Sequence, residues 1–175
     1  MSAILLIRNE STRKRLYRRD VLERIAERIA AQEAIEDDVE LSVLFCDNAF
    51  IQKLNAHYRG IDKPTDVLSF GQDANTASDG PRVLGDIVIS LEMVEERHQD
   101  IEDPVAARAA MREEVRLLFC HGMLHLLGHD HATSRDRALM AECQAEALGI
   151  PVEAAWLAPA TKSRRSPGGG QTHGG

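Results

Sequence analysis

The chain has few aromatic residues, few cysteines and no long apolar run. Its 175 residues include one tryptophan, two tyrosines and four phenylalanines, so aliphatic side chains must fill most of a core. Cys46, Cys120 and Cys143 are odd in number, which favours buried free thiols over a disulfide framework. The apolar run at residues 3–7 is too short for a membrane span or an export signal. We therefore expect a cytoplasmic protein without membrane association.

An excess of positive charge is also missing. The formal net charge is −7, whereas domains that bind nucleic acid usually carry a basic face. Two local concentrations of positive residues could still form such a face if folding brings them together. They are Arg8, Arg13, Lys14, Arg15, Arg18, Arg19, Arg59 and Lys63. For residues 13–19, a solvated charge run at the start of a helix is an equally good interpretation.

The apolar pattern predicts one compact α+β domain of the α/β type, with a small mixed sheet packed by helices. We expect this domain to cover residues 1–160, and a tail rich in serine, proline and glycine at 161–175 to be disordered. Branched apolar runs predict strands and helical spacing predicts helices. The expected strands are 3–8, 39–46, 67–70 and 83–90, and the expected helices are 17–32, 48–56, a central one from 104, and a last one from about 134 to 148.

The central helix carries the most informative residues. Asp103 before Pro104 is typical of a helix start, and residues 121–131 read His-Gly-Met-Leu-His-Leu-Leu-Gly-His-Asp-His. His121 and His125 lie one helical turn apart, with a rise of roughly 6 Å between their α-carbons. A glycine at 128 can take a positive φ and turn the chain back, so that His131 reaches the same ion. Three imidazoles leave the fourth position of a tetrahedral zinc site open, as in catalytic sites.

Two residues inside this motif limit the interpretation. His129 lies in the turn, where it could replace a ligand, carry a proton or only face water, and we do not assign it as a ligand. The spacing matches that of the metzincin peptidases, in which a glutamate follows the first histidine and acts as general base. Gly122 occupies that position here, so peptide hydrolysis by that mechanism lacks its proton acceptor.

Three further blocks precede the histidine motif. Residues 54–59 read Leu-Asn-Ala-His-Tyr-Arg, residues 64–70 read Pro-Thr-Asp-Val-Leu-Ser-Phe, and residues 84–87 read Leu-Gly-Asp-Ile. With the histidines, these four blocks resemble the YbeY family over about residues 41–149. The resemblance implies a metal-dependent endoribonuclease directed at single strands. It would act in ribosomal RNA maturation, including processing of the 16S rRNA 3′ end, and in ribosome quality control.

The resemblance also assigns residues and partners. The family's metal ligands fall on His121, His125 and His131, and its functional arginine falls on Arg59. One departure is visible, because the family commonly has tyrosine where this chain has His129. The implied cofactor is one Zn²⁺ per chain, although nickel, copper and cobalt also accept imidazoles. The implied partners are rRNA, the small ribosomal subunit and its assembly factors.

Phosphodiester chemistry suits an arginine beside a metal. A planar guanidinium holds two phosphate oxygens and stays charged, while a metal activates water or polarises a phosphoryl oxygen. Either water or the ribose hydroxyl could be the nucleophile. Two other functions stay open: a ribosome-assembly binding module that the metal only stabilises, and a metallohydrolase of another substrate class.

Overall fold

The computed structural model describes residues 1–72 and 80–156. The predicted tail at 161–175 lies outside these residues. The described residues form one α+β domain. Its elements are β1 (Ala3–Asn9), α1 (Arg19–Gln32), β2 (Val39–Cys46), α2 (Asn48–Arg59), β3 (Val67–Gly71), β4 (Arg82–Ser90), α3 (Leu91–Arg97), α4 (Pro104–Leu126), α5 (Ser134–Leu148) and the short 3-10 helix η1 (Val152–Ala154).

The four strands form a mixed sheet in the order β1-β2-β4-β3. Strands β1, β2 and β4 run parallel, whereas β3 pairs antiparallel with β4 and is an edge of the sheet. Strand β4 is nearly continuously buried from Leu84 to Ser90, because helices cover both of its faces. The predicted small mixed sheet is therefore confirmed.

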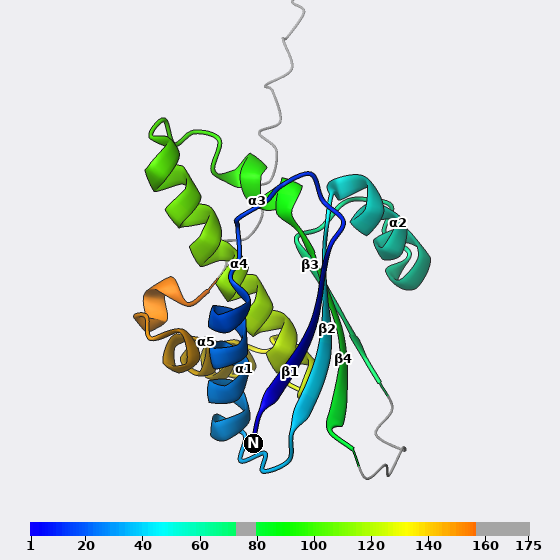
Figure 1. Cartoon of the computed structure of the whole chain (residues 1–175), viewed down its shortest axis with the longest axis vertical. Coiled ribbons are helices and arrows are strands. Elements are labelled where there is room, and N and C mark those ends of the chain that lie inside the picture. Colours follow the sequence, from blue (N-terminus) through cyan, green and yellow to red (C-terminus); the bar gives the residue numbers. More distant parts are fainter. Residues whose placement is uncertain (73–79, 157–175) are drawn as a thin grey trace, which may run out of the picture.

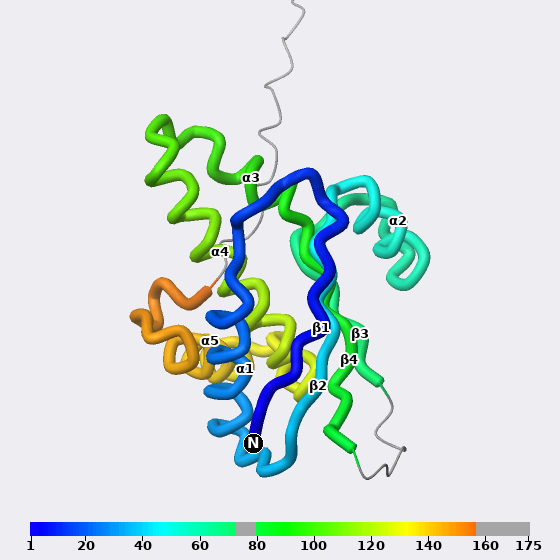
Figure 2. The backbone as a smooth tube through the Cα atoms, in the orientation of Figure 1, coloured from blue at the N-terminus to red at the C-terminus, as the bar shows by residue number. Residues whose placement is uncertain are grey.

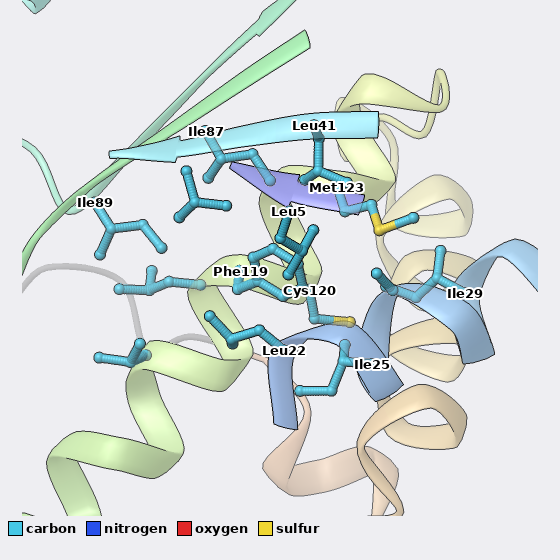
Figure 3. Packing of buried hydrophobic residues seen from close by; sticks show 14 of the residues in the cluster. Leu5, Leu22, Ile25, Ile29, Leu41, Ile87, Ile89, Phe119, Cys120 and Met123 are labelled. Carbon is cyan, nitrogen blue, oxygen red and sulfur yellow. The ribbon is translucent and has the colours of Figure 1, made fainter. Parts of the chain in front are cut away.

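Helices form one layer on each side of the sheet (Figure 1). Helices α1, α4 and α5 lie on one face and α2 lies on the other, as the tube in Figure 2 also shows. The larger apolar core fills the space between the sheet and the three-helix layer, where mostly aliphatic residues pack around Phe119 (Figure 3), and Phe45 is buried in the same cluster. A smaller cluster of Cys46, Ile51, Leu68 and Val88 joins α2 to the opposite face. Aliphatic residues thus supply most of the core, as the scarcity of aromatics requires.

Several element boundaries differ from the prediction. Helix α1 begins at Arg19, two residues later than expected, after an extended Arg18 whose side chain makes no cap. Helix α2 continues to Arg59 and ends at Gly60, which adopts a left-handed conformation. Helix α3 was not predicted, and Ser90 caps it by accepting a hydrogen bond from the Met93 amide at 3.3 Å.

Gly85 explains the Leu-Gly-Asp block in structural terms. Its φ is +138°, and a Cβ at this position would lie 2.1 Å from the carbonyl oxygen of Phe70 on β3. The register between β2 and β4 also shifts here, between Glu40 and Leu41. Only glycine fits this close approach of two backbones, so the block keeps β3 paired at the edge of the sheet.

Candidate metal centre

Three histidines meet where α4 ends. Residues His121 and His125 project from the last turns of α4, and His131 approaches from the segment before α5. Their ligating nitrogens all lie within 4.8 Å of one another, and the Nε2 atoms of His121 and His125 are 3.0 Å apart. Burial decreases from His121 through His125 to the exposed His131, so the cluster is closed on the protein side and open to solvent on the other.

The turn that returns His131 depends on Gly128. This residue has a φ of +95°, a region that side chains with a Cβ rarely adopt, although a Cβ there would meet open space. The Gly128 amide donates to the His125 carbonyl at 3.0 Å, and the His129 amide donates to the Leu124 carbonyl at 3.0 Å. These bonds close the helix end, and the Asp130 carboxylate then accepts from the His131 amide at 2.7 Å. The predicted positive φ at Gly128 is confirmed.

Gln144 orients the first histidine. Its side chain is fully buried on α5, and its amide nitrogen donates to the carbonyl oxygen of Ala155. The Gln144 oxygen must then be the acceptor for His121 Nδ1, 2.8 Å away, so this nitrogen carries the proton. The lone pair on His121 Nε2 is left facing His125. A ring fixed in this tautomer is prepared to bind a metal through Nε2.

Burial keeps the two helical histidines neutral at pH 7. Desolvation lowers the pKa of His121 to about 4, and it is the largest cause of the lowered pKa of His125. The neighbouring histidines lower both values further, while the hydrogen bond to Gln144 opposes the shift at His121. Neutral imidazole is the form that binds a metal, so no proton has to leave these two rings before an ion binds.

Trp156 covers one side of the cluster. The centre of its ring system lies 5.6 Å from the ring centres of both His121 and His131, and the Arg137 guanidinium carbon lies 4.7 Å from it. Neither Gln144 nor Trp156 was identified from the sequence. Trp156 is the only tryptophan of the chain, and this rarity was the signal that the sequence offered.

The Pro-Thr-Asp block also reaches this region. The carboxylate of Asp66 accepts from the Val67 amide at 2.7 Å and pairs with Arg97 at 3.0 Å, and Arg97 pairs with Glu114 of α4 at 2.5 Å. Asp66 is close enough to His121 to favour the charged form of that ring. The block therefore joins the start of β3 to the helix that carries the histidines.

Gly122 packs directly against the sheet. A Cβ at this position would lie 3.0 Å from Cγ2 of Ile87 and 3.1 Å from Oγ of Ser69, whose hydroxyl donates to the Gly122 carbonyl at 3.2 Å. Any side chain at this position would therefore crowd Ile87 and Ser69. The structure thus gives a packing reason for the missing general base.

Arg59 lies on the other side of the edge strand β3. It is the last, exposed residue of α2, and no hydrogen bond or aromatic contact within residues 1–72 and 80–156 joins it to the three histidines. The two regions are linked through β3, because Ser69 contacts Gly122 on the α4 side, and the ring of Phe70 lies 4.9 Å from that of Tyr58 on the α2 side.

The basic residues near the N-terminus are largely paired with acids. Arg13 makes ion pairs with Asp47 at 2.9 Å, Glu92 at 3.1 Å and Glu95 at 3.3 Å. Arg18 pairs with Asp20 at 2.9 Å. These pairs neutralise part of the charge at residues 13–19, and Arg13 in particular links the start of α2 to α3. Asp47 occupies the N-cap position of α2, but its carboxylate pairs with Arg13 and makes no capping hydrogen bond.

Among the described residues, no helix is both long and apolar enough to cross a membrane.

Comparisons with known proteins identify relatives over most of the chain. A family model described as Endoribonuclease YbeY matches residues 6–150. The Endoribonuclease YbeY of Thermoanaerobacter sp. (strain X514) is 40% identical over 140 residues, which cover 74% of this chain and 84% of that protein. That of Bacillus licheniformis is 39% identical over 155 residues, covering 85% and 94%. A solution structure of TM1509 from Thermotoga maritima is 24% identical and covers 93% of this chain and 100% of that one, with a TM-score of 0.47.

Proposed function

Because the chain belongs to the YbeY endoribonuclease family, we propose that it is a metal-dependent endoribonuclease that cleaves single-stranded regions of ribosomal RNA. The observation that carries the proposal is the group of three histidine nitrogens within 4.8 Å, open to solvent on one side. The proposed roles are maturation of rRNA, including the 16S 3′ end, and quality control of ribosomes. The partners would be the small ribosomal subunit and its assembly factors.

We propose that His121, His125 and His131 hold one Zn²⁺. Three observations fit this ion: the donors are all imidazoles, burial keeps two of them neutral, and Gln144 fixes the tautomer of one. Nickel, copper and cobalt remain alternatives with the same donors. When bound, the ion supplies Lewis-acid polarisation of a phosphoryl oxygen and lowers the pKa of water.

The chain's own residues would bind and orient the RNA. The guanidinium of Arg59 would bind two oxygens of a phosphate and stabilise the charge that develops on it during cleavage. Trp156 would shield one side of the three histidines, while the exposed His131 side stays accessible to a flexible strand. An unpaired strand that crosses the edge of the sheet at β3 would reach both Arg59 and the histidines.

The test is cleavage of a ribosomal RNA fragment with a single-stranded 3′ extension, using protein whose metal content has been measured. Wild type should cut the extension, and His125→Ala should lose both metal and cleavage. Arg59→Ala should lose at least 100-fold in rate while keeping the metal. Arg108→Ala, an exposed arginine in the first half of α4, is the matched control and should cut like wild type. Equal cleavage by all four proteins would reveal a contaminant and favour a binding module.

A further inference from the structure

A second group of metal-binding side chains includes one residue of the turn that leads to His131. Glu33 caps the C-terminus of α1, His129 lies in the turn after α4, and Cys143 projects from α5. Their carboxylate oxygen, imidazole nitrogen and sulfur all lie within 4.8 Å of one another, and all three residues are half-buried. We propose that Glu33, His129 and Cys143 bind a second transition-metal ion, with zinc as the favoured metal, separately from the three histidines.

The geometry needs only a small adjustment to hold an ion. Zinc bonds of about 2.0–2.3 Å place tetrahedral ligand atoms roughly 3.3–3.8 Å apart. The longest separation between two donor atoms, at most 4.8 Å, exceeds this range by at most about 1 Å. The separation between His129 Nε2 and Glu33 Oε1, 2.7 Å, is shorter than the range. Small side-chain rotations would satisfy both limits, since Glu33 follows α1, Cys143 lies on α5 and His129 lies in a turn.

The ligand chemistry is that of a zinc site. Thiolate, imidazole and carboxylate are the three donor types that zinc uses in proteins, and a sulfur donor disfavours magnesium and calcium. Water can occupy a fourth position because the cluster is only half-buried. The sulfur is the discriminating atom, because a simple hydrogen bond between His129 and Glu33 requires no cysteine beside it.

The electrostatic surroundings favour a cation. Burial is the largest cause of the raised pKa of the Cys143 thiol, followed by the carboxylates of Glu33 on α1 and of Glu146 and Glu142 on α5. On α4, the thiol of Cys120 is close enough to Cys143 that Cys143 adds to the raised pKa of Cys120. The negative charges of these carboxylates repel a free thiolate but attract a divalent cation. A bound cation would then stabilise the thiolate form of Cys143.

The second ion would hold the turn between α4 and His131 in place. An ion at this position connects the end of α1, the turn at His129 and the middle of α5. His131 follows two residues after His129, and Gln144, which orients His121, follows directly after Cys143. The second ion would therefore stabilise the segment that delivers the third histidine.

Cobalt binding tests the proposal without any measurement of RNA cleavage. Titration of the metal-free full-length protein with Co²⁺ should give two ions per chain and a thiolate-to-cobalt charge-transfer band in the near ultraviolet. Cys143→Ala should bind one ion and lose the band. His125→Ala should keep the band, because the histidine cluster contains no sulfur. Cys46→Ala, on the opposite face of the sheet, is the matched control and should behave like wild type.

A second variant keeps the test decisive if Cys143→Ala folds poorly. Glu33→Gln retains a hydrogen-bonding side chain for His129 but lacks the negative charge, so it should weaken binding of the second ion at least tenfold without changing the melting temperature of the metal-free protein. The proposal is overturned if wild type shows no charge-transfer band, if the band survives Cys143→Ala, or if Glu33→Gln binds cobalt as tightly as wild type. None of these results depends on whether the chain cleaves RNA.

Discussion

Replacing Gln144 with leucine should weaken metal binding and destabilise the fold. The buried amide accepts from His121 Nδ1 at 2.8 Å and donates to the carbonyl of Ala155. Leucine has a similar volume but would leave both partners buried without a hydrogen bond, at about 1–3 kcal/mol for each group. We expect the free energy of unfolding of the metal-free protein to fall by about 2–6 kcal/mol, the sum for the two groups. Loss of a hydrogen-bonding partner to a metal ligand typically lowers metal affinity about 10–100-fold.

Two measurements separate these effects. Urea unfolding of the metal-free protein gives the stability, and competition with a chromophoric chelator gives the zinc affinity. Gln144→Glu is the matched control, because it keeps an acceptor for His121 but loses the donor to Ala155. It should therefore lose stability while keeping a zinc affinity close to that of wild type. Gln144→Leu with wild-type zinc affinity, or equal losses of affinity in both variants, would refute the orienting role.

Three other changes test the fold around the site. Gly122→Ala would place a Cβ 3.0 Å from Ile87, and urea unfolding should show a loss of about 1–3 kcal/mol; unchanged stability would contradict the close packing. Gly128→Ala must adopt a φ near +95°, at a cost of about 1–3 kcal/mol, and a zinc titration should show weaker binding because the turn carries the third histidine. Burial raises the pKa of Cys46 and Cys120 to about 12, so about one thiol in ten thousand is ionised at pH 8. Mass spectrometry should find both unmodified by iodoacetamide in the native protein and modified in urea, and rapid modification of the native protein would contradict their burial.

Local signals predicted where α4 and α5 begin. The Asp103 side chain accepts from the amides of Val105 and Ala106, and the Thr133 hydroxyl accepts from the Asp136 amide at 3.1 Å. These capping bonds form between residues two or three positions apart, so the sequence alone carries the information. The turn at Gly128 was predictable for the same reason, because positive φ is a property of one residue.

Contacts between distant segments were not predictable in this way. The bond between Gln144 and His121 spans 23 positions, and it depends on how α5 packs on α4. The ion pairs of Arg13 depend on the order of the strands, which places α2 and α3 beside the segment after β1. No rule of spacing or composition identifies which glutamine contacts a metal-binding histidine or which arginine pairs with distant acids. These contacts are determined by the tertiary packing of the helices and strands.

Gly122 shows how packing and reaction class are linked in this chain. From the sequence, glycine at this position only removes the general base of a zinc peptidase. In the structure the same residue lets α4 approach β3 and β4, because a Cβ would lie 3.0 Å from Ile87 and 3.1 Å from Ser69. That approach brings α4 against the edge strand β3. On the opposite side of β3, Phe70 contacts Tyr58, which precedes Arg59 at the end of α2. A glutamate at 122 would therefore do more than add a base, because its Cβ would crowd Ile87 on β4 and Ser69 on β3, the strand that lies between the histidines and the arginine.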